Sequence, residues 1–101
     1  MHYVICYDLE NDRLRNRDAK LLERHGCLRV QKSVFTAPHL EKKHLTALQL
    51  ALRQLFARLP PMPDDSLYLL PLPEEYVAGV WAVGNNNICT SLLDKPLKII
   101  L

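Results

Sequence analysis

Helix-like and strand-like segments alternate along this 101-residue chain in the order β-α-β-β-α-β, which predicts an α+β fold of the ferredoxin-like type. In this βαββαβ sandwich two helices back one face of an antiparallel sheet, and we expect an extra C-terminal strand. The length predicts a single domain over residues 1–101, with its core in residues 1–80 and C-terminal strands in residues 81–101. The opposite sheet face must then meet solvent or a partner.

The composition excludes several classes of protein. No apolar run approaches the roughly 20 residues that a membrane span needs, and the first residues lack the pattern of a signal peptide. We therefore expect a cytoplasmic protein that has no membrane partner. Its cysteines, Cys6, Cys27 and Cys89, are odd in number and form no CxxC spacing. This argues against a disulfide framework and a structural zinc site, so we expect buried thiols.

Positive charge is concentrated in the first half of the chain. Residues 1–58 contain eleven Lys and Arg against six Asp and Glu, whereas residues 59–101 contain two against five. The whole chain carries only +2. This distribution indicates a local patch for an anionic partner, with an ordinary solvated surface as the alternative.

The first strand is predicted at His2–Tyr7, a strongly β-prone run. Its side chains alternate, with Tyr3, Ile5 and Tyr7 on one face and Val4 and Cys6 on the other. Asp8 ends the strand. A carboxylate at the tip of a strand can bind a hard cation or orient a water molecule, but it can equally cap the turn that follows.

The first helix is predicted over Asp12–His25, with Asn11 or Asp12 as its N-cap and Gly26 as the left-handed residue after its end. Its apolar side faces the core and consists of Leu14, Leu21 and Leu22.

Another side of this helix carries a basic stripe. At about 100° per residue, four cations fall within about 60° of one another. They are Arg13, Arg17, Lys20 and Arg24. Arg15 belongs to neither side and lies near the strand end that carries Asp8. Arginine forks suit phosphate, and Arg13, Arg15, Arg17 and Arg29 supply them. The alternative is that these arginines pair with the carboxylates of Glu10, Asp12 and Asp18, and that the stripe only balances Glu10, Asp18 and Glu23.

Leu28–Thr36 is predicted as a second strand, whose extended end accounts for the uncertain fourth element of the pattern. One face carries Leu28, Val30 and Val34, and the other carries Arg29, Gln31, Ser33 and Phe35. The second face is too polar for a core yet includes an aromatic ring. We therefore predict an isologous homodimer contact with Phe35 near the two-fold axis.

A long amphipathic helix is predicted from His39 to Leu59, because leucines recur at alternating spacings of three and four residues until Pro60 and Pro61. The leucines are Leu45, Leu48, Leu52, Leu55 and Leu59. Strands are then predicted at Ser66–Leu72, at Val80–Gly84 and at Lys98–Leu101, while Pro73–Gly79 is either a helical turn or a loop.

The usual catalytic signatures are absent from the sequence. It has no glycine-rich phosphate loop, no nucleophile elbow and no HExxH motif. Its histidines share no metal-binding spacing, so we expect His2, His25, His39 and His44 to be surface or packing residues. A lone Asp8 is a poor nuclease site, whereas two copies brought together by a two-fold axis make a better one.

Several stretches carry a resemblance. They are Tyr7-Asp8, Arg15-Asn16-Arg17, Ala19-Lys20-Leu21-Leu22, Gly26 and the run RVQKSVF at residues 29–35. In these stretches the chain resembles the small CRISPR-associated adaptation protein, the Cas-two family. The likeness is close over residues 3–36 and looser over the later long helix, strand, Gly84 and terminal strand. The YD pair alone is weak, but at this distance from RVQKSVF it is specific.

This resemblance implies a ferredoxin-like homodimer with its two sheets face to face and with the last strand of each subunit added to the other's sheet. It also implies a partnership with the Cas-one integrase, in which the dimer bridges two integrase dimers and holds a protospacer duplex. Members are described as metal-dependent ribonucleases or deoxyribonucleases whose YD aspartate lies in the metal site.

By matching position, the resemblance makes Asp8 the Mg²⁺ ligand, with Mn²⁺ as the alternative metal. It makes Arg15, Arg17 and Arg29 nucleic-acid or dimer-site residues, and it makes Ser33 and Phe35 residues that shape the site. Thr36 stands where many relatives have an acidic residue, so the resemblance supplies no second carboxylate near Asp8.

Three functions follow as hypotheses. We predict a DNA-holding adaptor for spacer acquisition, in which a duplex lies across the basic stripes of a dimer. The second is a Mg²⁺-dependent endonuclease acting on DNA or RNA, in the same system or as a stand-alone endoribonuclease of toxin type. The third is a small-molecule regulatory module, which only the fold supports. An RNA-recognition module is disfavoured because residues 28–35 lack interleaved aromatic side chains.

Overall fold

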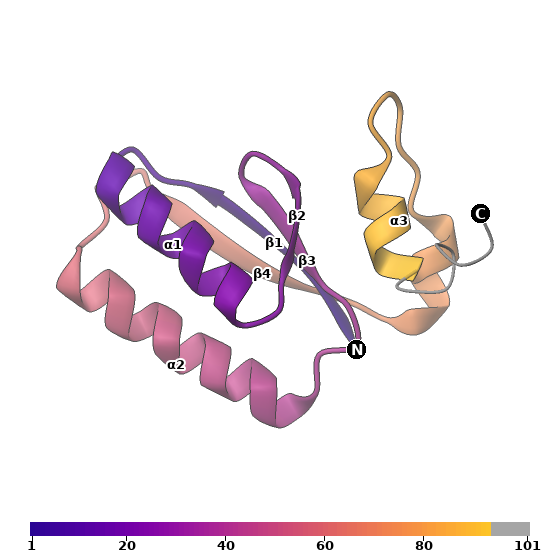
Figure 1. The fold of residues 1–101 in the computed structure, drawn as a ribbon, viewed down its shortest axis with the longest axis horizontal. Coiled ribbons are helices and arrows are strands. Elements are labelled where there is room, and N and C mark those ends of the chain that lie inside the picture. Colours follow the sequence, from indigo (N-terminus) through magenta and orange to yellow (C-terminus); the bar gives the residue numbers. More distant parts are fainter. Residues whose placement is uncertain (94–101) are drawn as a thin grey trace.

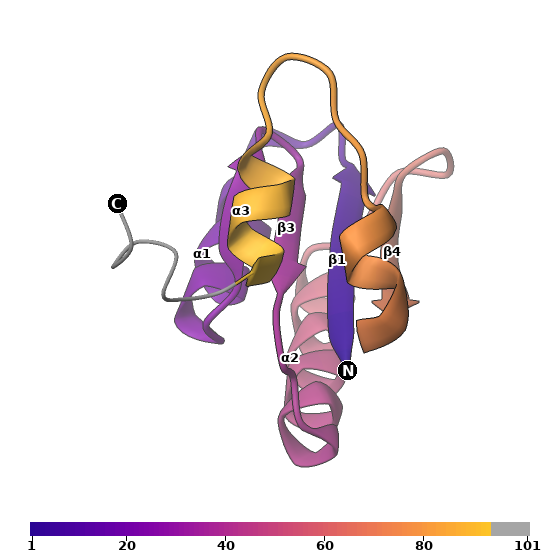
Figure 2. The ribbon, with the colours of Figure 1, turned by 90° about the vertical axis from the view of Figure 1, so that its right-hand side faces the viewer.

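The computed structural model describes residues 1–93 and contains one four-stranded antiparallel sheet. Its elements are β1 (His2–Asp8), α1 (Asp12–Arg24), β2 (Leu28–Gln31), β3 (Val34–Ala37), α2 (Lys42–Arg58), β4 (Ser66–Leu72), the 3₁₀ helix η1 (Glu74–Gly79) and α3 (Asn87–Leu93). The strand order is β2-β3-β1-β4. Helices α1 and α2 cover one face of the sheet, and α3 lies on the opposite face (Figures 1 and 2). The ferredoxin-like α+β fold is thus confirmed.

Strand β1 lies at the centre of the sheet and alternates as predicted. Ile5 and Tyr7 are buried toward the helices, where the Tyr7 ring stacks on Phe35 of β3 at 6.1 Å between centroids. Val4 and Cys6 face the other side. On that side Cys6 is aligned with Val34 of β3, and we call this side of the sheet the open face.

Helix α1 begins at Asp12 as predicted and ends at Arg24, one residue before the predicted end, with His25 as its C-cap. The Asn11 side chain accepts a hydrogen bond of 3.0 Å from the backbone N–H of Leu14, as an N-cap does. At the other end Gly26 has a φ of +85°, and its N–H donates to the carbonyl of Glu23. The N–H of Cys27 donates to the carbonyl of Leu22. This pair of bonds is a Schellman motif, which explains why a glycine follows the helix.

The single strand predicted over residues 28–36 is wrong, because the chain reverses at Lys32 and Ser33 and forms the separate strands β2 and β3. A bulge between Arg29 and Gln31 further shifts the alternation. Arg29 therefore lies beside Phe35 on the helix side, whereas Gln31 faces the open side. The predicted polar face does not exist as one surface, and Phe35 is fully buried in the core.

Helix α2 packs its leucine stripe into the core as predicted, with Leu48, Leu52 and Leu55 buried. It begins at Lys42, three residues after the predicted start. His39 has a positive φ of 53°, which is outside the right-handed helical region, so the helix cannot include it.

The C-terminal part departs from the prediction. Residues 74–79, left open between a helical turn and a loop, form η1. The strand predicted at Val80–Gly84 is wrong, since this segment is irregular and exposes 82% of Trp81. Helix α3 follows where C-terminal strands were expected, and its Ser91 hydroxyl accepts a 2.8 Å hydrogen bond from Thr36. The strand predicted at Lys98–Leu101 lies outside the described residues.

The cysteines are free thiols. Cys27 is buried, while Cys6 and Cys89 are partly buried. Burial, with the carboxylate of Asp18 nearby, raises the pKa of Cys27 to about 11, so this thiol is unreactive. Among the helices of residues 1–93, none is long and apolar enough to cross a membrane.

Asp18 is a carboxylic acid in the core of the protein. It is fully buried, and neither side-chain oxygen has a hydrogen-bond partner among the described residues. Because burial disfavours the charged form, the pKa of Asp18 rises from 3.8 to about 7. The folded chain therefore holds this proton more tightly than the unfolded chain. The stability cost is absent below the unfolded pKa of 3.8 and grows until the pH passes about 7.

We predict that Asp18→Asn stabilises the protein more at about pH 8 than at about pH 5, because only the aspartate must ionise in the core. Each pKa unit corresponds to about 1.4 kcal/mol, so the difference in free energy of unfolding between the two proteins should widen by at least that amount. Thermal and urea unfolding at both pH values measure it. A difference that stays constant with pH would contradict the prediction, and Asp18→Val provides an apolar second variant.

Candidate functional site

Asp8 lies at the carboxyl end of β1, and its side chain is exposed. In the register of β1 with β4 it is aligned with Ser66, the first residue of β4. A hollow of about 350 Å³ opens there. We call it the acidic hollow, because four of its six lining residues are carboxylic acids. The lining consists of Asp8, Glu10, Met62, Pro63, Asp64 and Asp65.

Two of these acids differ in what their side chains already bind. Asp65 accepts hydrogen bonds from the backbone N–H of Glu10 at 3.1 Å and of Met62 at 2.9 Å, so it fastens the loop after β1 to the loop before β4. Asp8 makes no side-chain hydrogen bond within residues 1–93, and the cap of α1 is Asn11. The alternative that Asp8 is a turn cap is therefore wrong.

Asp64 and Asp65 were missed in the sequence, although a signal for them existed. They directly precede Ser66–Leu72, and in a ferredoxin-like fold the last strand runs antiparallel to the first. The start of β4 must then lie beside the end of β1. Thr36, which stands where many relatives have an acidic residue, is buried and aligned with Val4. The neighbours of Asp8 thus come from a different loop.

The acidic hollow fits a hard divalent cation. Carboxylate oxygens are the ligands that Mg²⁺ prefers, and Mg²⁺ usually uses one or two of them and keeps several waters. Asp8, Glu10 and Asp64 are the acids of this hollow that could serve, since Asp65 is already hydrogen-bonded through both oxygens.

Arg15 lies beside this end of β1, as predicted, but its donors are engaged. Its Nη1 donates to the carbonyls of Leu9 at 2.9 Å and of Glu10 at 3.4 Å, and its Nη2 pairs with Asp12. Arg15 therefore holds the segment that follows Asp8, which includes Glu10 of the acidic hollow. Its pairing with Asp12 is the structural alternative anticipated for the arginines.

The other residues assigned by resemblance do not gather around Asp8. Ser33 comes near, because its carbonyl accepts a 3.1 Å hydrogen bond from the N–H of Tyr7. Phe35 is a core residue, and the Arg29 guanidinium lies 5.0 Å from the centre of its ring. Arg17 lines a separate hollow between α1 and α2. Of the residues assigned by resemblance, only Arg15 and the backbone of Ser33 lie near the end of β1 that carries Asp8 in the part of the chain that the structure describes.

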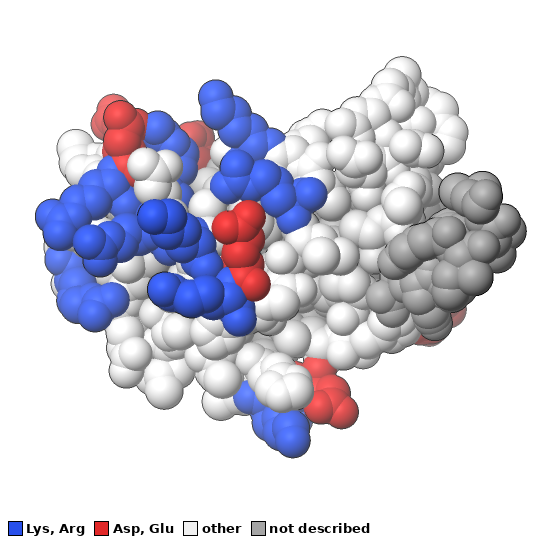
Figure 3. Space-filling model, in the orientation of Figure 1, with Lys and Arg blue, Asp and Glu red and all other residues white. Residues whose placement is uncertain are grey.

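The basic stripe of α1 is exposed and opens into a groove between the two helices. We call this groove, of about 280 Å³, the basic groove; Arg17, Lys20, Leu21, Arg24, Leu55 and Arg58 line it. Figure 3 shows the cations gathered over this side of the molecule. None of the four groove cations, Arg17, Lys20, Arg24 and Arg58, pairs with a carboxylate among residues 1–93, and Asp18 is buried without a hydrogen-bond partner there. The pairing alternative therefore fails for the groove cations.

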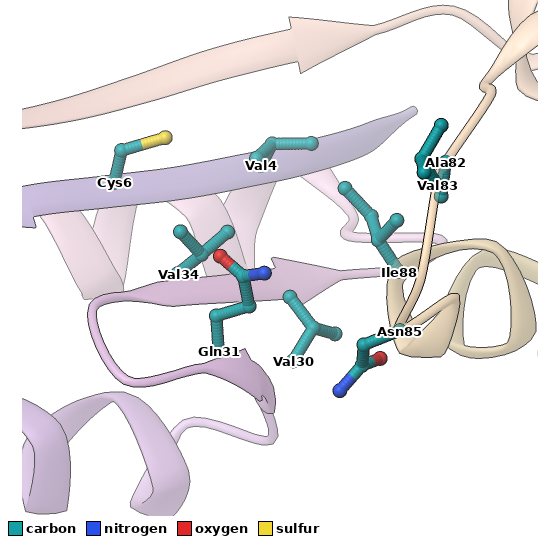
Figure 4. A pocket seen from close by; sticks show the side chains of 9 residues that line it. All are labelled: Val4, Cys6, Val30, Gln31, Val34, Ala82, Val83, Asn85 and Ile88. Atoms are coloured by element: carbon teal, nitrogen blue, oxygen red, sulfur yellow. The ribbon is translucent and has the colours of Figure 1, made fainter.

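The open face of the sheet is divided into two parts. The α3 side of the sheet, over β2 and β3, encloses a cavity of about 400 Å³, in which the side chains of Val4 and Val34 face Ile88 of α3 (Figure 4). Beyond it, Tyr68 and Leu70 of β4 remain 59% and 47% exposed. An apolar strip along β4 is thus uncovered in the single chain.

A second group of metal-ligand types lies at the start of β1. Ligand atoms of His2, His39 and Glu74 lie within 4.8 Å of one another, and among the described residues only this trio does so. Nδ1 of His2 accepts a 3.1 Å hydrogen bond from the backbone N–H of His39. The proton of a neutral ring is then on Nε2, which lies 2.8 Å from the Glu74 carboxylate and donates to it. The buried histidine is satisfied without a metal.

Comparisons with known proteins agree with this architecture. The family described as "CRISPR associated protein Cas2" matches residues 1–79. The chain is 40% identical over 73 residues to the "CRISPR-associated endoribonuclease Cas2 2" of Synechocystis, which covers 72% of this chain and 73% of that protein.

Two solved structures share the fold. The Streptococcus pyogenes Cas2 structure superposes with a TM-score of 0.65 at 21% identity, covering 83% of this chain and all of that one. A chain of a partial Cas6-RT-Cas1–Cas2 complex superposes with a TM-score of 0.70 at 24% identity, covering 86% of this chain and 88% of that chain.

Proposed function

This chain belongs to the CRISPR-associated Cas2 family, and from that membership we propose that it acts in the cytoplasm as a homodimeric adaptor that holds duplex DNA for the Cas-one integrase, Cas1, during spacer acquisition. The observation that carries the proposal is the row of exposed cations on α1, of which Arg17, Lys20 and Arg24 have no ion pair among the described residues.

Duplex DNA suits this surface because phosphate charge dominates nucleic-acid affinity. The stripe lies on the outer side of α1, away from the sheet on which the helix packs, so a duplex can reach it without disturbing the core (Figures 1 and 3). Phosphate contacts fix the position of a duplex and carry no base information. An adaptor that must accept many different spacer sequences requires that property.

Dimerisation would use the open face. Tyr68 and Leu70 expose apolar side chains on β4, whereas Leu28, 45% exposed, lies on β2 at the opposite edge of the sheet and is not part of this strip. An exposed apolar strip on a sheet is a typical site for association, and a two-fold axis lets one strip cover its own copy. This proposal moves the contact from the buried Phe35 to β4, and it places the duplex-binding helices on the outside of the dimer.

The partnership with Cas1 is supported at the level of the fold. A chain of similar fold belongs to a complex whose name includes Cas1 and Cas2. A dimer with two outward basic stripes has the symmetry to bridge two integrase dimers across one duplex.

The acidic hollow favours a second activity, metal-dependent cleavage of a phosphodiester on RNA or DNA. The Synechocystis relative is named an endoribonuclease. Asp8, together with Glu10 or Asp64, would hold Mg²⁺ or Mn²⁺, and the bound ion would supply charge stabilisation to the phosphodiester. Arg15 would act as a positioning residue by fixing the segment after Asp8. A stand-alone endoribonuclease of toxin type is the alternative form of this activity.

We predict that Arg17→Glu combined with Arg24→Glu weakens duplex binding and flattens its salt dependence by about 0.9 in log-log slope for each phosphate that is no longer neutralised. Filter binding or fluorescence anisotropy over a salt series measures this. Lys42→Glu with Lys43→Glu, which reverses two exposed cations at the start of α2, is the matched control. If the α2 pair lowers affinity and the α1 pair does not, the duplex lies on α2 and the proposal is wrong.

We predict that Leu70→Glu converts the dimer to a monomer, because it places a charge in the apolar strip on β4. Light scattering at micromolar concentration measures the mass of each protein. Leu50→Glu is the control, since Leu50 is exposed to 56% on α2 and lies off the sheet. A stable monomer of the unaltered protein, or a dimer that tolerates Leu70→Glu, would contradict the proposed contact.

We predict that phosphodiester cleavage requires Mg²⁺ or Mn²⁺ and is lost in Asp8→Asn, which keeps the shape of the side chain but weakens it as a ligand. Cleavage of labelled RNA and DNA with and without chelator measures this. Glu75→Gln removes an exposed charge from η1 and should leave cleavage unchanged. Full activity of Asp8→Asn, or activity in chelator, would contradict the role of Asp8.

A further inference from the structure

We infer that the basic groove between α1 and α2 is a discrete subsite for one backbone phosphate of the bound duplex, and that Arg58 of α2 completes it. The inference rests on the proposed DNA-holding function and adds a residue from a second helix to it. The groove, of about 280 Å³, exceeds the roughly 30 Å³ share of one water severalfold and admits a phosphate group with its waters.

The charges lining the groove have one sign. Arg17, Lys20 and Arg24 come from α1 and Arg58 comes from α2, and no carboxylate belongs to the lining. None of these four cations makes an ion pair with a described residue. Arg15, on another side of α1, differs from this set because it is paired with Asp12. Four cations around one hollow repel each other, and an anion in their midst relieves that repulsion.

Helix dipoles do not explain the whole arrangement. Arg24 and Arg58 lie in the last turns of their helices, where cations are favoured by the helix dipole. Arg17 and Lys20 lie in the middle of α1 and gain nothing from that effect. Their convergence with Arg58 across the helix pair is therefore a feature of the groove.

The base of the groove strengthens the interaction with an anion. Leu21 and Leu55 lie between the cations and are buried to 7% and 2% exposure. A charge held over apolar side chains is less screened than one on an open surface. The guanidinium forks of Arg17, Arg24 and Arg58 can each donate two hydrogen bonds to phosphate oxygens, which a flat lysine patch cannot match.

Arg53 provides the matched control on the same helix. It is exposed like Arg58, but it lines a different hollow whose lining includes the carboxylic acid Asp65. Arg58→Gln and Arg53→Gln remove the same charge from the same helix. If the phosphate is held in the groove, the two variants differ in duplex binding, although their net charges are equal.

The test measures binding of the full-length protein to a duplex of arbitrary sequence over a salt series. Arg58→Gln should lower the magnitude of the log-log slope by about 0.9, so its salt-driven decrease in affinity between about 50 and about 200 mM is about 3.5-fold smaller, while Arg53→Gln keeps the slope of the unaltered protein. Circular dichroism confirms that each variant folds.

Two outcomes overturn the inference in distinguishable ways. If Arg58→Gln and Arg53→Gln have equal slopes while the Arg17→Glu and Arg24→Glu pair still weakens binding, the subsite is absent and the DNA-holding function stands. If the Arg17→Glu and Arg24→Glu pair also binds the duplex normally, the proposed function itself fails and the subsite fails with it.

Discussion

The central position of β1 determines where each candidate site of this protein lies. Because β1 is hydrogen-bonded on both edges, to β3 and to β4, its residues fix the register of the sheet. Its inward side chains join α1 and α2 into the core, and this brings the helices close enough to form the basic groove. Its end places Asp8 opposite the start of β4 and so forms the acidic hollow. Its outward side chains create an apolar face that one chain covers only in part.

Much of the fold could be predicted because short local patterns in the sequence determine it. The alternation of residues 3–7, the caps of α1 and the leucine stripe of α2 each report a period or a turn that depends on a few neighbours. The hairpin between β2 and β3 escaped prediction because Lys32 and Ser33 are not the glycine or asparagine that usually marks such a turn. Because the chain turns there, the alternation of side chains differs from the prediction, and Phe35 lies in the core and not on the expected surface. Irregular residues 80–84 were mistaken for a strand because valines and Trp81 favour strands without regard to what they pack against.

The candidate sites were harder to predict because they join distant segments. Asp64 meets Asp8 only through the pairing of β4 with β1, and Arg58 meets the stripe of α1 only through the packing of two helices. Asp18 is an exception. It follows Leu14 by four residues and precedes Leu21 by three, which places it on the apolar side of α1. The pattern thus indicated that Asp18 is buried, but an acid is so rarely buried without a partner that an ion pair with an arginine was the expectation.

The two groups of metal-ligand residues in this chain differ in how ready they are to accept an ion. For His2 to bind through Nε2, the proton must move to Nδ1, where it would face the N–H of His39 instead of accepting from it. Binding there would also break the hydrogen bond to Glu74. Asp8 has no such bond to lose among the described residues, and its oxygens are exposed on the rim of a hollow lined by other acids. By the spacing of its ligand atoms the histidine group is the better metal site. It is the poorer one once the hydrogen bonds that an ion would have to break are considered. For a cation that keeps most of its waters, the looser acidic hollow is the better site, and it lies where the end of β1 already places a carboxylate.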